Sequence, residues 1–248
     1  MSNPFQSPMY QRHSARRLEH LGSLSLDLVG KSVLEVGGGD GHQSSFFIDR
    51  GCRVLFTDSR QANLNLTKLW MTAYTPMMRQ YAGRPGPNPT FTQRLLDLEN
   101  PPDSFPSSFD VVYNYGVLYH VGKPKEVLEF LAPRAPLTLV ETCLSFGTHS
   151  DPCFIKENKN SPTQSSSSGG CRPTRPWVCE RLSELYKFVY NTRTQPWHAA
   201  YPLDWTKPNI HNAAFARGVF IGSQTPIANT NLVLYEGPDS IPMQQVRH

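Results

Sequence analysis

The feature that most constrains this chain is a short apolar strand that runs directly into a glycine-rich loop. Residues 33–36 are aliphatic apart from Glu35. The glycines that follow are Gly37, Gly38, Gly39 and Gly41. Glycine lets the backbone turn sharply and approach a ligand where a Cβ would collide. Because residues 42–50 then have a helix-compatible pattern, the unit predicts a nucleotide cradle at the carboxyl edge of a parallel sheet.

The spacing of these glycines discriminates between nucleotides. A dinucleotide fingerprint needs G-x-G-x-x-G, and His42 occupies the position of its third glycine. A nicotinamide-dependent dehydrogenase is therefore only an alternative. The pattern Glu35-x-Gly37-x-Gly39-x-Gly41 resembles motif I of the class I S-adenosylmethionine-dependent methyltransferases. The resemblance implies that S-adenosylmethionine is the cofactor, that the loop wraps its methionine part, and that Glu35 helps to hold its ammonium group.

Three later segments resemble the same family in the same order. Residues 53–58 predict a second strand that ends in Asp58, about twenty residues after the loop, where a ribose diol needs a bidentate acceptor. The resemblance implies further cofactor contacts from residues that end or follow strands. They are Asp58 and Ser59, then Asp97 and Leu98 near the adenine, and Asn114 and Tyr115 at the tip of a fourth strand that resembles motif IV.

The pattern of strands and helices predicts an α/β fold in one domain, residues 1–248. The resemblance implies a Rossmann-like, seven-stranded methyltransferase sheet with helices on both faces. Residues 137–142 predict the fifth strand, and residues 188–192 and 218–222 predict the sixth and seventh. In the family that the chain resembles, these last two strands are an antiparallel pair. Residues 231–236 add one more apolar strand. An amphipathic helix within residues 1–29 precedes the sheet, and in the family such leading helices often close over the cofactor.

Two segments break the regular alternation of strand and helix. Residues 147–175 are rich in Ser, Pro, Asn and Gly, which predicts a flexible insertion near the carboxyl edge of the sheet. Residues 193–216 contain Trp197, His198 and Trp205. Exposed tryptophans are unfavourable, so these rings are expected to cover something. We interpret 193–216 as a substrate lid, although simple packing on the sheet edge is the alternative.

Composition excludes several classes of protein. The hydrophobic fraction is 38%, and no apolar run approaches the ~20 residues of a bilayer span. Residues 1–11 lack the pattern of a secretory signal, so we expect a cytoplasmic protein with no membrane partner. Five cysteines without a C-x-x-C pair argue against a disulfide framework and a metal site. A net charge of +4 does not demand a polyanionic partner.

The candidate catalytic residues follow the fourth strand. A methyl acceptor that is a hydroxyl or a protonated amine needs a general base, and histidine titrates in the right range. His120 is the first candidate, the adjacent Tyr119 is a further catalytic candidate, and His198 and His149 are lesser candidates for the base. A structural, hydrogen-bonded role is the alternative for each histidine.

The sequence says less about the identity of the methyl acceptor than about that of the cofactor. We expect a small molecule or a glycan, methylated on oxygen or nitrogen. Residues 116–120, with Lys123 and Pro124, and residues 217–221 are similar to the tRNA wobble-uridine carboxymethyltransferases, so RNA is the alternative acceptor. A catalytically silent binding protein of the same fold is a third possibility, and the oligomeric state stays open.

Overall fold

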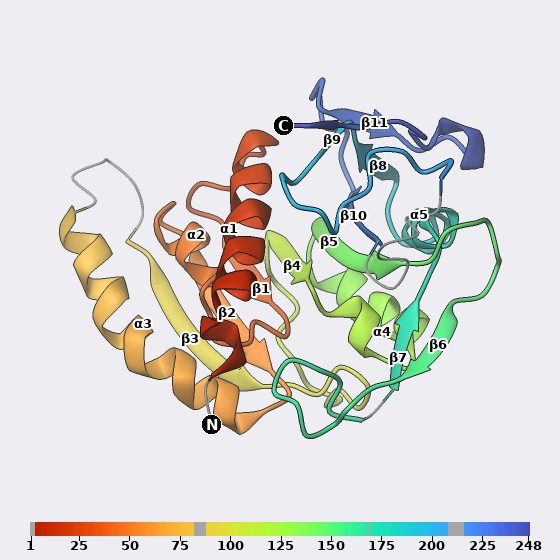
Figure 1. Cartoon of the computed structure of the whole chain (residues 1–248). Coiled ribbons are helices and arrows are strands. Elements are labelled where there is room, and N and C mark those ends of the chain that lie inside the picture. Colours follow the sequence, from red (N-terminus) through yellow and green to blue (C-terminus); the bar gives the residue numbers. More distant parts are fainter. Residues whose placement is uncertain (1–2, 82–87, 168, 208–215) are drawn as a thin grey trace.

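The computed structural model describes residues 3–81, 88–167, 169–207 and 216–248, which form an α/β fold around a central sheet (Figure 1). The sheet has eight strands in the order β11-β8-β10-β5-β4-β1-β2-β3. In sequence order they are β1 (Ser32–Glu35), β2 (Arg53–Asp58), β3 (Thr90–Leu95), β4 (Val111–Tyr115), β5 (Leu137–Leu144), β8 (Phe188–Thr192), β10 (Ala216–Ser223) and β11 (Leu232–Leu234). This confirms the predicted fold class, and β11 at one edge is the further strand predicted within residues 231–236.

The strand directions create the edge at which a ligand can bind. Strands β1 to β5 are mutually parallel, whereas β10 runs antiparallel to both β5 and β8. The chain leaves β1 toward β2 on one side and returns through β4 on the other. In open α/β sheets such a switch point opens a crevice at the carboxyl ends of the strands.

Helices cover both faces of the sheet because each presents apolar residues to it. On one face lie α1 (Pro8–Ser23), α2 (Ser44–Ile48) and α3 (Gln61–Tyr81). The other face carries α4 (Pro124–Leu131) and α5 (Arg175–Ser183). Phe47 of α2 packs edge-on against Tyr113 of β4, with the ring centroids 4.9 Å apart. Val127 of α4 is fully buried on the opposite face.

Local capping explains where two of these helices begin. Ser7 precedes α1, and its hydroxyl oxygen accepts a hydrogen bond from the backbone N–H of Tyr10. Thr174 caps α5 in the same way through the N–H of Trp177. Both helices carry a proline in the first turn, where no backbone N–H is required.

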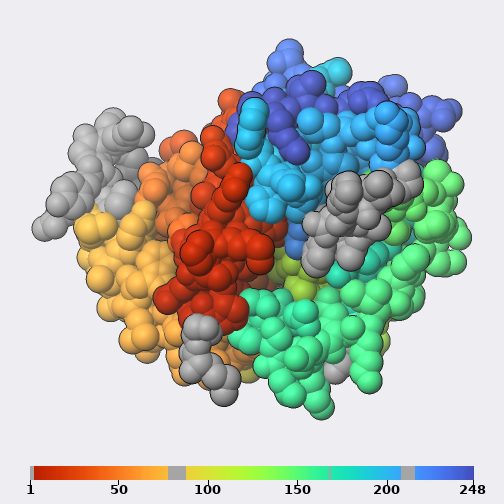
Figure 2. All heavy atoms as spheres, viewed as in Figure 1, coloured from red at the N-terminus to blue at the C-terminus, as the bar shows by residue number. Residues whose placement is uncertain are grey.

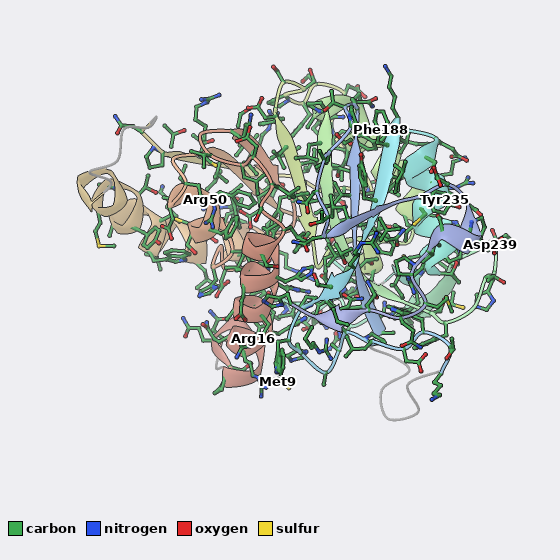
Figure 3. The ribbon with its side chains drawn as sticks, turned by 90° about the horizontal axis from the view of Figure 1, so that it is seen from above. Met9, Arg16, Arg50, Phe188, Tyr235 and Asp239 are labelled. Atoms are coloured by element: carbon green, nitrogen blue, oxygen red, sulfur yellow. The ribbon has the colours of Figure 1, made fainter. Side chains whose placement is uncertain are left out.

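In Figure 3, which shows the molecule from above, the part of α1 with Met9 and Arg16 lies well apart from Phe188 on β8.

The segment predicted as a flexible insertion contains paired structure. Strands β6 (Cys153–Lys156) and β7 (Gly169–Arg172) form an antiparallel pair, and Cys171 is fully buried. The pairing uses backbone groups, so a shortage of apolar side chains did not reveal it. The helix α5 begins at Arg175, the last residue of the predicted insertion. Mobility of the segment remains a prediction.

The segment predicted as a lid contains one buried and one exposed tryptophan. Trp205 donates its indole N–H to Gln245 at 2.7 Å and packs against Phe146, whereas the Trp197 side chain is 55% exposed. Strand β9 (Thr194–Gln195) pairs with β12 (Val246–Arg247) in parallel. Residues 208–215 of the predicted lid lie outside the described residues, so closure over a substrate remains a prediction.

Neither a metal cluster nor a membrane span is found in the described part of the chain. No three His, Cys, Asp or Glu side chains there are placed to hold a metal ion. The five cysteines are free thiols. Within the described ranges, no helix is long and apolar enough to cross a bilayer.

A buried ionic cluster joins the N-terminal helix to the sheet. The Glu141 carboxylate of β5 accepts hydrogen bonds from Arg17 of α1 at 2.8 Å, from Arg217 of β10 at 3.0 Å and from the Tyr201 hydroxyl at 2.9 Å. Burial opposes ionisation of Glu141, but Arg17 and Arg217 outweigh it and hold its pKa below the usual value. We call these four residues the Glu141 cluster.

Neutralising Glu141 should destabilise the protein strongly. In Glu141→Gln the two buried guanidinium groups lose the carboxylate that they share, and breaking such a pair costs about 3–5 kcal/mol. Urea unfolding followed by circular dichroism measures the change. Glu129→Gln, on the exposed side of α4, is the matched control and should shift stability by less than about 0.5 kcal/mol. Equal stability of the two variants would contradict the role of the cluster.

Candidate active site

A cavity of about 560 Å³ lies at the carboxyl edge of the sheet. In Figure 2 the surface is hollowed between the red N-terminal helix, the cyan-blue segment above it and the green segment below, with yellow-green atoms at the floor. Small-molecule sites measure about 300–1,000 Å³, so the cavity has room for one. The sequence-predicted residues that line it are Gly37, Gly39, Asp58, Ser59, Asp97, Leu98, Tyr115, Tyr119, His120 and His198.

The glycines of the first loop divide into two pairs. Gly37 and Gly39 line the cavity, and Gly39 has a φ of +63°, in the region that favours glycine. Gly38 and Gly41 instead permit close packing. A Cβ at Gly38 would lie 2.1 Å from the Phe56 ring of β2. The loop thus sits tightly on the sheet while its backbone faces the cavity.

Besides Gly38 and Gly41, two more of the predicted cofactor residues do not line the cavity. Glu35 is buried beneath the loop, where its Oε2 accepts a hydrogen bond from Ser44 Oγ at 2.5 Å, and burial raises its pKa to about 8. Asn114 is fully buried in β4, and neither side-chain atom has a hydrogen-bond partner among the described residues. Neither residue lines the pocket.

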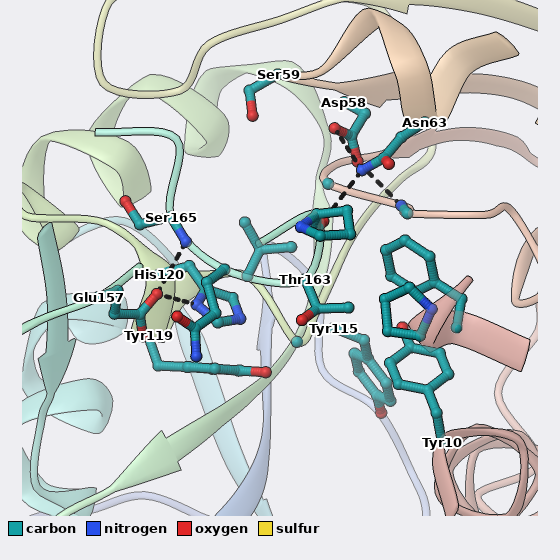
Figure 4. Close-up of a pocket in the computed structure, with 18 of the residues that line it drawn as sticks. Tyr10, Asp58, Ser59, Asn63, Tyr115, Tyr119, His120, Glu157, Thr163 and Ser165 are labelled. Carbon is teal, nitrogen blue, oxygen red and sulfur yellow. Dashed lines mark hydrogen bonds and ion pairs between the residues drawn. The ribbon is translucent and has the colours of Figure 1, made fainter. Parts of the chain in front are cut away.

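Asp58 is fixed at the end of β2 by three donors. Its carboxylate accepts the backbone N–H of Gly39 at 3.0 Å and of Arg60 at 2.8 Å, and the side-chain amide of Asn63 at 3.1 Å. Burial raises the pKa of Asp58, although these hydrogen bonds oppose the rise. The contact with Gly39 ties the second strand to the glycine loop, so both face one end of the cavity (Figure 4).

Asp97 follows the end of β3 rather than lying within it. Its carboxylate accepts the backbone N–H of Glu99 and the side-chain amide of Asn100, both at 3.0 Å. These bonds hold the Asp97 side chain in a turn beside Leu98, which is buried. Both residues line the cavity near Asp58, as the motif spacing predicts.

The N-terminal segment forms a wall that the sequence predicted only in outline. Phe5, Tyr10, His13 and Arg17 all line the cavity. A Cβ at Gly39 would lie 2.7 Å from the Phe5 ring, so this segment packs directly on the glycine loop. Tyr115 lines the cavity as well, and its hydroxyl has no partner among the described residues.

His120 is paired with a carboxylate at the other end of the cavity. Its Nδ1 lies 2.5 Å from Glu157 Oε2, and the same oxygen accepts the backbone N–H of Ser165 at 2.9 Å (Figure 4). No described residue bonds to His120 Nε2. Burial lowers the pKa of His120, while Glu157 acts to raise it. Glu157 follows β6, in the segment that sequence reasoning treated as unstructured, and was therefore missed.

Tyr119 and His198 are placed differently from each other. The Tyr119 hydroxyl accepts a hydrogen bond from Arg217 Nη2 at 2.9 Å, and its ring centroid is 3.9 Å from that of His120. His198 stacks near His13, with centroids 4.7 Å apart, so it lies by the N-terminal wall. His149, the remaining candidate, is exposed and does not line the cavity.

Comparison with known proteins identifies the fold. No protein-family model matches the chain, and no curated protein is similar to it in sequence. The N-terminal domain of EvdMO1, with SAH and D-fucose present, is similar in structure with a TM-score of 0.60 and 17% identity, covering 85% of this chain and 82% of that chain. The chain has the class I methyltransferase fold.

Two further solved structures are similar to this methyltransferase fold. Magnesium protoporphyrin IX methyltransferase of Synechocystis PCC 6803 with bound SAH gives a TM-score of 0.54 at 14% identity, covering 91% of this chain and 89% of that chain. A complex of the Haloferax volcanii Trm112 activator with a methyltransferase also gives 0.54, at 13% identity, covering 89% and 92%. At these identities the likeness extends to the fold alone.

The His120–Glu157 pair should titrate abnormally. We expect the pKa of His120 to lie below 6.5, and to fall further in Glu157→Gln because the carboxylate that favours the imidazolium is lost. Imidazole chemical shifts followed by NMR across pH 4–8 measure both values. Glu184→Gln, on the surface of the molecule, is the control. A pKa that is unchanged or raised in Glu157→Gln would show that the pair does not form.

Proposed function

We propose that this protein is an S-adenosylmethionine-dependent methyltransferase that acts on a hydroxyl or amine of a small molecule or glycan, with His120 as general base. One observation carries the proposal. A single cavity has the glycine loop, Asp58 and Asp97 at one end, and the His120–Glu157 pair at the other. The fold supports the proposal, because the structural neighbours with SAH or SAM bound share it.

The residues at the first end fit this cofactor. Asp58 is suited to a ribose diol because its carboxylate is held rigidly, and Asp97 is suited to the adenine amino group. Arg17 Nη1 has no acceptor among the described residues and lines the cavity beside Gly116, so we assign it to the methionine carboxylate. When bound, S-adenosylmethionine supplies a methyl group already activated on a sulfonium.

The residues at the second end fit a proton acceptor. A buried base with a lowered pKa is neutral at physiological pH, and His120 meets this condition. Glu157 accepts the Nδ1 proton, which leaves the Nε2 lone pair free to take a proton from an acceptor hydroxyl or amine. Methyl transfer also depends on alignment of the acceptor with the methyl group and the sulfur, and a shared cavity brings the two ends together for this.

The first consequence of the proposed function is that the protein binds S-adenosylhomocysteine. Titration calorimetry should show S-adenosylhomocysteine binding in the micromolar range, about −8 kcal/mol. Asp58→Ala should weaken binding about tenfold or more, because charge-assisted hydrogen bonds contribute roughly 1.5–3 kcal/mol each. Asp103→Ala, at an exposed position, is the control and should bind normally. Binding of NADH in place of S-adenosylhomocysteine would instead support the dehydrogenase alternative.

Turnover should depend on both members of the His120–Glu157 pair. With labelled S-adenosylmethionine and fractionated cell metabolites as acceptors, His120→Ala should lower transfer by about 10²–10⁴-fold and leave S-adenosylhomocysteine affinity unchanged. The wild-type rate should rise with pH through an ionisation below 6.5, and in Glu157→Gln this midpoint should move to lower pH. His149→Ala should behave as wild type. Full turnover by His120→Ala would make the histidine structural.

A further inference from the structure

The two ends of the cavity carry different charged groups. Glu99 lies toward the His120 end, because its carboxylate accepts the backbone N–H of Gly122, two residues after His120. The end that holds the glycine loop has two carboxylates, from Asp58 and Asp97, and one guanidinium, from Arg60. Arg60 Nη2 already donates hydrogen bonds to backbone carbonyls, including that of Lys159 at 2.8 Å. This end is therefore negative, which suits a ligand with hydroxyl and amino donors.

Three arginines line the His120 end of the cavity: Arg17, Arg172 and Arg217. Among the described residues they form ion pairs with Glu141 and Glu157. The Arg17, Arg217 and Glu141 side chains are each at least nine-tenths buried. Because Arg17 is assigned to the methionine carboxylate of the cofactor, Arg172 and Arg217 are the two arginines left for another ligand.

Arg172 and Arg217 lie close to the same aromatic ring. Their guanidinium carbons are 5.1 Å and 4.6 Å from the centroid of Tyr119, and the Tyr119 and His120 rings are adjacent. Both guanidinium groups therefore lie near the proposed base. They come from β7 and β10, which are far apart in sequence.

Neither guanidinium has used all its donors. Arg217 donates hydrogen bonds from Nη1 to Glu141 and from Nη2 to the Tyr119 hydroxyl, and no described residue accepts a hydrogen bond from its Nε. Arg172 donates hydrogen bonds from Nη1 to the backbone carbonyls of Tyr119 and Cys171. Its Nη2 is 3.8 Å from Glu157 Oε1, which is too far for a hydrogen bond. Each arginine therefore retains a donor for an oxyanion, and charge-assisted hydrogen bonds of this kind are strong.

A buried guanidinium donor without an acceptor is unfavourable, so a ligand that supplies an anion binds well. The cofactor does not supply this anion, because its one carboxylate is assigned to Arg17. We propose that the methyl acceptor carries an oxyanion, a carboxylate or a phosphate monoester, which binds Arg172 and Arg217 beside His120. This inference rests on the proposed function and specifies its substrate class.

The test compares acceptors that differ only in charge. A panel of hydroxylated aromatic and aliphatic compounds is prepared in three forms of similar size: carboxylate, phosphate monoester and neutral carboxamide. Each is titrated into the protein saturated with S-adenosylhomocysteine. One of the anionic forms should bind at least tenfold more tightly than the carboxamide, and the anion that is preferred identifies the source of the charge.

Two variants link this preference to the arginines. Arg172→Gln should lower the preference for the anion about tenfold or more, and Arg217→Lys should lower it while preserving the charge that Glu141 requires. Arg53→Gln, at the amino end of β2 and away from the cavity, is the control and should retain the preference. Thermal melts establish that each variant is folded.

The outcomes separate this inference from the proposed function. No binding of S-adenosylhomocysteine overturns the proposed function, and this inference with it. Normal binding of S-adenosylhomocysteine overturns this inference alone if the carboxamides bind as well as the anions, if no anion binds, or if the preference survives in both Arg172→Gln and Arg217→Lys.

Discussion

The carboxylate of Glu141 is the contact on which the shape of the cavity depends. It bonds Arg17 from α1, Arg217 from β10 and Tyr201 from the segment after β9, and it belongs itself to β5. Three walls of the cavity are therefore held to one buried charge at the sheet. A buried ion pair adds little net stability over apolar packing, but separating its partners leaves uncompensated buried charges, so the Glu141 cluster favours the arrangement that keeps them together. The cluster positions α1 across the carboxyl edge, where Phe5 packs on the glycine loop.

The positions of the charges explain how one cavity has two chemically different ends. Parallel strands bring Asp58 and the glycine loop together at the switch point, where backbone N–H groups and carboxylates face a common space. The opposite end is built from β4, β7 and β10, with Glu157 contributed by the chain after β6. Because these elements belong to different parts of the sequence, the proposed base and the oxyanion site are formed by the tertiary fold alone.

The sequence predicts those parts of the structure that a pattern of neighbouring residues determines, and it does not predict contacts between residues far apart in the chain. The strands 53–58 and 188–192 were predicted with the bounds observed, because each is a continuous apolar run that ends in polar residues. Asp58 ends β2 and Asp97 follows β3. Both aspartates line the cavity because the carboxyl ends of these parallel strands lie at the same edge of the sheet. The pairing of Arg17 with Glu141 spans 124 positions and leaves no local pattern. Glu157 was missed because the segment 147–175 as a whole is rich in Ser, Pro, Asn and Gly, yet backbone pairing orders β6 and β7.

The most direct test of the proposed site is a crystal structure of the protein with S-adenosylhomocysteine bound. We expect the ribose hydroxyls within hydrogen-bond distance of the Asp58 carboxylate, the adenine beside Asp97, and the sulfur facing the side of the cavity that holds His120 Nε2. S-adenosylhomocysteine bound in the opposite orientation, with its adenine at the His120–Glu157 pair, or bound outside this cavity, would contradict the assignment of the two ends.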